Sequence, residues 1–144
     1  MRPTKAYTSG RFGQIHYCWL GDGAPLVLMH QSPTCMVQFQ KVWALLAARG
    51  NRVIGIDLPG FGGSDGPEEV PAIADYAHVI PAVLDALDIA RADVLGHHTG
   101  AIVATEAALQ FPERFARLIL NGPLPLSAEE RAYFRQHLAQ EKTW

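Results

Sequence analysis

The sequence predicts an α/β fold in which helices cover both faces of a mostly parallel sheet. Short apolar runs alternate along the chain with longer amphipathic segments, a pattern typical of strands that alternate with helices. Most of these runs are apolar at successive positions rather than at every second one, which indicates strands buried on both faces. With 144 residues, of which 49% are hydrophobic and 18% charged, the chain can form such a core.

The first pair of strands is expected to differ from the others. Residues 14–20 are mixed in polarity and follow a turn at 9–13, so this pair should be antiparallel and lie near an edge of the sheet. The later strands are predicted from the two-sided apolar runs at 26–29, 53–56, 94–95 and 118–121.

Three amphipathic segments between these strands are predicted helices. The first, over 32–50, starts with Ser32 as cap and a proline at the first helical position, and ends at a glycine. The second, over 73–87, contains Pro81, which lacks an N–H and should kink the helix. The third, over 99–111, is rich in small residues that would let it lie close against the sheet.

Charge and composition argue against several classes of protein. The chain has 12 Lys and Arg against 14 Asp and Glu, a net charge of −2, and no basic run that would bind nucleic acid or an acidic membrane surface. No apolar run is long enough to cross a bilayer, and no targeting segment is visible. Two cysteines are too few for a disulfide scaffold, so reduced thiols and a cytoplasmic location are expected.

His16 shows no metal-ligand spacing with other histidines and is interpreted as a solvated or packing residue.

The strongest chemical motif is Gly-His-His-Thr-Gly at 96–100, between a predicted strand and the small-residue helix. Small residues around a central polar one, at a sharp turn from strand to helix, are typical of a nucleophile elbow. Such a turn leaves the central side chain, here His98, exposed at the carboxyl edge of the sheet. The backbone N–H of Thr99 would then point toward a developing oxyanion.

Two further motifs lie after predicted strands: Met-His-Gln-Ser-Pro at 29–33 and Asp-Leu-Pro-Gly-Phe-Gly-Gly-Ser-Asp at 57–65. With the elbow, they make residues 8–125 resemble the α/β-hydrolase fold superfamily. The resemblance is closest to the branch of epoxide hydrolases, haloalkane dehalogenases and related esterases and lyases. It implies a fold of α/β-hydrolase type, a small-molecule substrate, no cofactor and no metal.

The resemblance also implies roles for single residues. Gln31 would supply the first backbone N–H of an oxyanion hole and Thr99 the second, although the family commonly has glycine at the position of Gln31. It gives structural or pocket-lining roles to four other residues: His30, Ser32, Asp57 and His97.

His98 stands where the family usually has serine, aspartate or cysteine, which leaves its chemistry open. An imidazole can deprotonate water near neutral pH, form an acyl-imidazole as nucleophile, or hold an oxyanion as a cation. We therefore expect a hydrolase of a small ester, lactone or similar substrate. The alternative is a non-catalytic pseudoenzyme or fragment that keeps the scaffold and a binding or partner role.

The domain organisation is expected to be incomplete. Residues 1–125 would form the N-terminal part of the core and 126–144 the first helix of a cap, which opens with a capping box at 127–130. Complete members of the family continue through further strands, so a fragment truncated after the sixth strand is expected. The strand at 118–121 would then be an apolar sheet edge that a homodimer partner or a second chain could cover.

Overall fold

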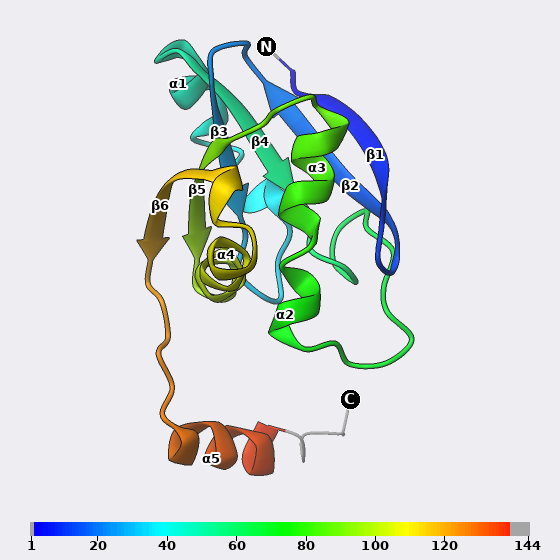
Figure 1. The fold of residues 1–144 in the computed structure, drawn as a ribbon, viewed down its shortest axis with the longest axis vertical. Coiled ribbons are helices and arrows are strands. Elements are labelled where there is room, and N and C mark those ends of the chain that lie inside the picture. Colours follow the sequence, from blue (N-terminus) through cyan, green and yellow to red (C-terminus); the bar gives the residue numbers. More distant parts are fainter. Residues whose placement is uncertain (1, 139–144) are drawn as a thin grey trace.

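A computed structural model describes residues 2–138 and contains a six-stranded, mostly parallel sheet (Figure 1). Along the sheet the strands follow the order β1-β2-β4-β3-β5-β6. β2 pairs antiparallel with both β1 and β4, whereas the remaining neighbours are parallel. The predicted fold class and the antiparallel first pair are thus confirmed. The strands are β1 (Thr4–Gly10), β2 (Gly13–Leu20), β3 (Ala24–Met29), β4 (Asn51–Ile56), β5 (Ala92–His97) and β6 (Phe115–Asn121).

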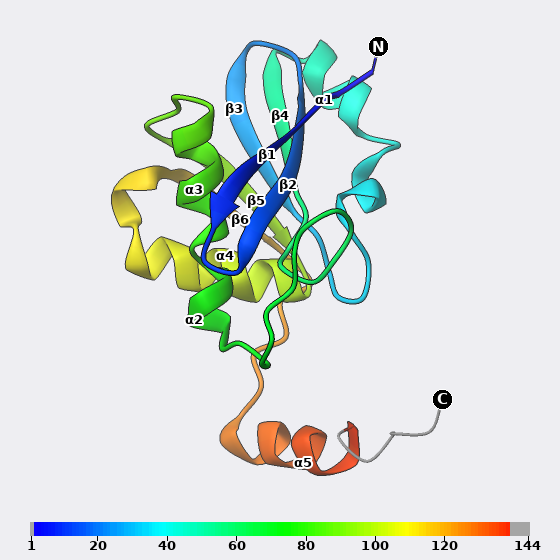
Figure 2. The ribbon, with the colours of Figure 1, turned by 90° about the vertical axis from the view of Figure 1, so that its right-hand side faces the viewer.

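Helices cover both faces of this sheet. On one face, apolar side chains of the central strands pack against α3 (Val79–Ala86) and α4 (Thr99–Gln110). On the other face, η1 (Met36–Phe39) and α1 (Trp43–Ala48) bury Met36 and Trp43 against β2, β3 and β4. Figure 2 shows the sheet edge-on between these two layers.

The continuous helix predicted over 32–50 is wrong. Residues up to Cys35 form a turn and an extended segment, followed by the short η1 and then α1. Long-range hydrogen bonds hold the early part out of a helix, because the N–H of Ser32 donates to Thr99 Oγ1 and the N–H of Met36 to Asp57 Oδ1. The predicted end is correct, since Gly50 follows α1 with a φ of 86°.

The segment predicted as one kinked helix is divided into α2 (Ile73–Tyr76) and α3. Pro81 has no N–H to donate to the carbonyl of Ala77, four residues before it, and the helix is interrupted at Ala77–His78. A short helix η2 (Pro112–Arg114) then leads from α4 into β6.

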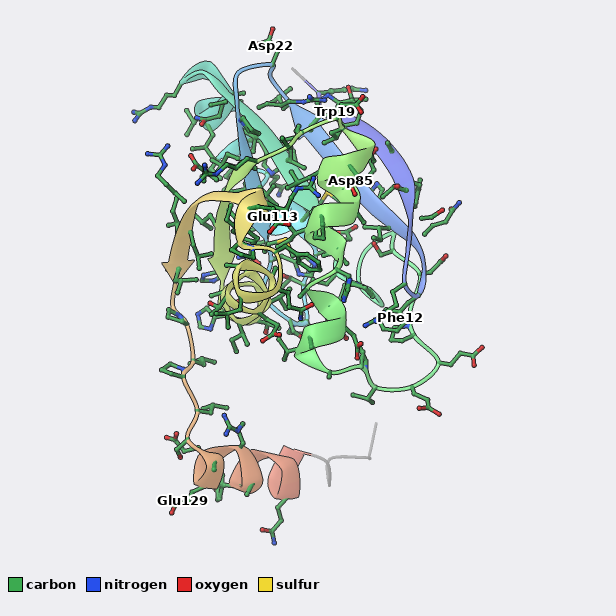
Figure 3. The ribbon with its side chains drawn as sticks, viewed as in Figure 1. Phe12, Trp19, Asp22, Asp85, Glu113 and Glu129 are labelled. Atoms are coloured by element: carbon green, nitrogen blue, oxygen red, sulfur yellow. The ribbon has the colours of Figure 1, made fainter. Side chains whose placement is uncertain are left out.

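The helix α5 (Ala128–Leu138) stands apart from the sheet at the end of an extended segment (Figure 1). Its predicted capping box is present: the Ser127 N–H donates to Glu130 Oε2 at 2.7 Å, and the Glu130 N–H donates to Ser127 Oγ at 3.1 Å. The exposed side chain of Glu129 points away from the rest of the molecule (Figure 3). The remainder of the predicted cap segment, residues 139–144, lies outside the described residues.

Candidate active site

The turn between β5 and α4 has the backbone of a nucleophile elbow. His98 lies between the last residue of the strand and the first of the helix, with a φ of 48° and a ψ of −113°. A positive φ is sterically unfavourable for a residue with a Cβ and recurs at functional sites.

Two glycines are required by the close packing around this turn. A Cβ on Gly96 would lie 2.3 Å from the carbonyl oxygen of Gly100. A Cβ on Gly100 would lie 2.1 Å from the carbonyl oxygen of Met29, on the neighbouring strand β3. Glycine at both positions therefore allows α4 to begin directly against the ends of β5 and β3.

The His98 side chain is half-buried beside the end of β6. Its backbone N–H donates to the carbonyl of Asn121 at 3.0 Å, and a Cβ on Gly122 would lie 3.0 Å from its Nε2. Within residues 2–138, neither ring nitrogen of His98 has a hydrogen-bond partner. The part of the chain that the structure describes thus places no carboxylate to orient this imidazole.

His97 lies next to this imidazole, with ring centroids 4.4 Å apart and an edge-to-face angle of 75°. Its Nδ1 is buried without a hydrogen-bond partner, the sole such side-chain atom among the described residues. A buried polar atom without a partner is unfavourable, and in this structure that cost is carried directly beside the elbow.

His30 joins the loop after β3 to the loop after β4. It is fully buried, and its Nε2 accepts the N–H of Leu58 at 2.9 Å. Its Nδ1 lies 2.8 Å from the carbonyl of Gln31, to which it donates. Burial lowers the pKa of His30, so the ring is neutral and carries its proton on Nδ1. Through these two bonds it holds the two loops together.

In the loop at 31–34, the N–H groups of Gln31 and Ser32 point in different directions. The N–H of Gln31 donates to Gln38 Oε1 at 3.1 Å, and Thr34 Oγ1 donates to the same oxygen at 3.0 Å. The N–H of Ser32 instead points to the elbow, where it donates to Thr99 Oγ1 at 3.3 Å. Thus the N–H of Ser32, rather than that of Gln31, faces the elbow in this structure.

Asp57 follows β4 and is buried, with only 2% of its surface exposed. Its Oδ1 accepts the N–H of Met36 at 2.8 Å, and its Oδ2 accepts the N–H of Gly63 at 2.9 Å. His16 Nδ1 also lies 2.8 Å from Oδ2. These bonds tie β2, η1 and the turn after β4 together, so Asp57 is part of the scaffold beside the elbow.

The pair formed by His16 and Asp57 was not expected from the sequence. The two residues are 41 positions apart and meet because β2 and β4 pair antiparallel, with Tyr17 opposite Ile56. Only knowledge of that register would reveal the pair, because neither residue belongs to a local motif with the other.

The predicted site residues therefore fall into two groups. His98, Thr99, Ser32 and Gln31 meet at the carboxyl ends of β3 and β5, which are adjacent in the sheet. His30, His97 and Asp57 support the loops around them. Among the described residues, no cluster of three or more His, Cys, Asp or Glu could hold a metal, and no helix is long and apolar enough to span a bilayer.

Residues 24–142 match the family described as the alpha/beta hydrolase fold. The chain belongs to the α/β-hydrolase fold family. The matched residues include both loops and the elbow described above.

Curated α/β-hydrolase relatives with similar sequences are longer than this chain. A haloalkane dehalogenase of Psychrobacter cryohalolentis is 34% identical over 115 residues, covering 77% of this chain and 38% of the relative. A 2-hydroxy-6-oxononadienedioate/2-hydroxy-6-oxononatrienedioate hydrolase of Burkholderia vietnamiensis is 38% identical over 114 residues, covering 76% of this chain and 40% of that hydrolase. The chain thus aligns with less than half the length of each of these relatives.

Solved structures of other proteins superpose on most of this chain. A hydrolase from Pseudomonas aeruginosa superposes with a TM-score of 0.85 at 26% identity, over 94% of this chain and 52% of that one. An esterase from Exiguobacterium antarcticum superposes with a TM-score of 0.78 at 27% identity, over 83% of this chain and 46% of the esterase. The first part of the family fold is therefore present in this chain.

Proposed function

We propose that this α/β-hydrolase chain belongs to an enzyme that hydrolyses a small ester, lactone or similar substrate, with His98 as the reacting side chain. The observation that carries the proposal is the positive φ of His98 at the elbow. This strained turn presents an imidazole where the fold places its reacting group. Relatives named as hydrolases and an esterase support the reaction class.

The chemistry that best suits an imidazole at this position is general base catalysis. His98 would take a proton from water as the hydroxide attacks the substrate's carbonyl carbon. The resulting oxyanion would accept hydrogen bonds from the backbone N–H groups of Thr99 and Ser32. Collapse of the intermediate would break the bond to the alkoxide, which takes up the proton from the imidazolium.

The oxyanion hole in this proposal uses Ser32 in place of the expected Gln31. The Gln31 N–H is engaged by Gln38, whereas the Ser32 N–H already points to Thr99 at the elbow. Because the contact with Thr99 Oγ1 is 3.3 Å long, an oxyanion could replace it at little cost.

The test is the hydrolysis of p-nitrophenyl acetate and butyrate by the purified chain and by His98→Ala and His98→Ser. Loss of general base catalysis should lower the rate by about 100-fold or more in both variants. A matched histidine control is His78→Ala, which removes an imidazole that packs against Phe111 away from the elbow. Its rate should equal that of the unmodified chain.

The pseudoenzyme alternative has its own support in the absence of a carboxylate partner for His98 within residues 2–138. Equal rates in the unmodified chain, His98→Ala and His98→Ser would overturn the catalytic proposal and favour this alternative. A rate lost in His98→Ala and also lost in His78→Ala would likewise count against it, because the effect would not be specific to the elbow.

A further inference from the structure

A cavity of about 300 Å³ lies on the α1 face of the sheet, between β1–β2 and the η1–α1 segment. None of its lining residues belongs to the elbow or to the loop that follows β3. Figure 2 shows α1 and α4 on opposite sides of the sheet, which separates this cavity from the helix that begins at the elbow. The cavity is therefore distinct from the candidate active site.

The walls of this cavity are mostly apolar. Leu20 and Met36 form part of the buried cluster beneath it, and Trp43 is 5% exposed. The thiol of Cys18 also lines the wall and donates to Met36 Sδ at 2.9 Å. Burial raises the pKa of Cys18 to about 12, so this wall carries a neutral thiol with no reactive thiolate. Such walls suit the apolar body of a small ligand.

The two charged groups in the cavity differ in how far other groups of the protein compensate their charge. Asp57 accepts three hydrogen bonds, from Met36, Gly63 and His16, so its negative charge is already compensated. Lys5 also lines the cavity, and no carboxylate of the described residues lies within ion-pair distance of it. The free charge that the cavity offers to a ligand is therefore positive.

His16 adds a polar group whose orientation is fixed. Its Nδ1 is held by Asp57, and its ring also lies 5.0 Å from that of Tyr7. Its other ring nitrogen has no hydrogen-bond partner among the described residues, although the ring lines the cavity. A carboxylate that accepts the Nδ1–H of an imidazole leaves Nε2 open, and Nε2 donates to an anion when the ring carries both protons and accepts a hydrogen bond when it does not.

We propose that this cavity binds a small organic anion with a flat apolar body, of the aryl carboxylate class. The carboxylate would pair with Lys5 beside His16, and the ring would pack between Met36 and Trp43. The volume suits a ligand of one or two fused rings, at the lower end of ordinary ligand pockets. The site is independent of the proposed hydrolysis, since none of its residues takes part in that chemistry.

The test is the binding of 2-naphthoate to the full chain, measured by calorimetry and by the chemical shifts of the protein's backbone N–H groups. 2-Naphthamide is the matched neutral probe and should bind about tenfold more weakly or not at all. Lys5→Met removes the charge from an exposed position of β1 and should weaken naphthoate binding by about tenfold, to the level of the amide. Lys41→Met, at the other lysine of the described residues and outside this cavity, should leave binding unchanged.

A cavity-filling variant tests the location separately from the charge. Ala44→Phe adds a ring at an exposed residue of the cavity rim and should abolish the binding of both probes. The backbone N–H signals in the NMR spectrum of this variant should remain those of a folded chain. No binding of 2-naphthoate at millimolar concentration would overturn the proposal. Equal binding of acid and amide, or binding unchanged by Lys5→Met and Ala44→Phe, would overturn it as well. None of these results depends on whether the chain hydrolyses esters.

Discussion

At the scale of single residues, His30 shows how one buried side chain makes folding depend on pH. It bridges the loops after β3 and β4 as a neutral ring, and burial lowers its pKa below the ordinary value of 6.5. As the pH falls below about 6.5, the unfolded chain takes up a proton that the native chain does not. The free energy of unfolding should therefore decrease on acidification and level off only below the native pKa.

This expectation can be checked by NMR and by urea unfolding. The Cε1–H signal of His30 should titrate below pH 6.5 in the native chain. Urea midpoints should fall between about pH 7.5 and about pH 5.5, and a His30→Asn variant should lack that part of the slope. Titration of His30 at or above 6.5 would contradict the neutral, Nδ1-protonated ring described here.

The residue pairs that could be predicted are those set by local sterics. Gly96 and Gly100 flank His98 at fixed spacing, and this pattern alone indicates the strained turn that the structure contains. The bond from the Gln31 N–H to Gln38 could not be predicted in this way, because it depends on where η1 ends up after the loop. Although the two residues are only seven positions apart, this bond depends on the irregular path of the loop between them, which leaves no periodic signal in the sequence.

At the scale of elements, the start of α4 packs so closely against β3 that it leaves no room for a Cβ at Gly100. Alanine is normally more favourable than glycine in a helix by about 1 kcal/mol. At Gly100 that preference should be reversed, since a Cβ would lie 2.1 Å from the Met29 carbonyl oxygen and push α4 away from β3. We expect Gly100→Ala to lower the free energy of unfolding by about 1–3 kcal/mol, the usual range for overpacking.

Urea unfolding of Gly100→Ala beside Leu109→Ala measures this effect. Leu109 lies on the same helix but is 74% exposed, so its truncation should change stability by less than about 0.5 kcal/mol. A Gly100→Ala chain as stable as the control, or more stable, would show that α4 can move without loss of packing.

The sequence predicts which segments form strands and which form helices better than it predicts where each helix begins and ends. The later strands are marked by apolar runs and the first pair by the turn between them, and the structure contains each of them, whereas two of the three predicted helices between strands are divided. The division at Ala77–His78 follows from Pro81, a local cause visible in the sequence. The division before α1 follows from bonds to Thr99 and Asp57, which are distant in sequence.

At the scale of the whole molecule, β6 is an edge of the sheet that exposes large apolar side chains. Ile119 is 44% exposed and Leu120 42% exposed on this strand, and no further strand of residues 2–138 pairs with it. Exposed apolar edges of this kind favour pairing with another chain. We therefore expect the chain to self-associate through β6, as an edge-to-edge dimer or a larger species.

Light scattering after size-exclusion chromatography, over a range of concentrations, tests this expectation. Ile119→Lys places a charge on the edge and should shift the chain toward monomer. Leu109→Lys puts the same charge on an exposed apolar residue of α4 and should leave the association unchanged. A chain that is monomeric at every concentration would contradict an edge-driven association.

The strained turn at His98 lowers the stability of the folded chain. Glycine would adopt a φ of 48° without steric cost, whereas a histidine there is disfavoured by about 1–3 kcal/mol. Neither ring nitrogen of His98 forms a hydrogen bond within the described residues that would return this energy. Apart from its edge-to-face packing on His97, the imidazole therefore has no described contact that offsets the strain of the turn. Such uncompensated strain is what a side chain kept at the cost of stability for binding or catalysis would show.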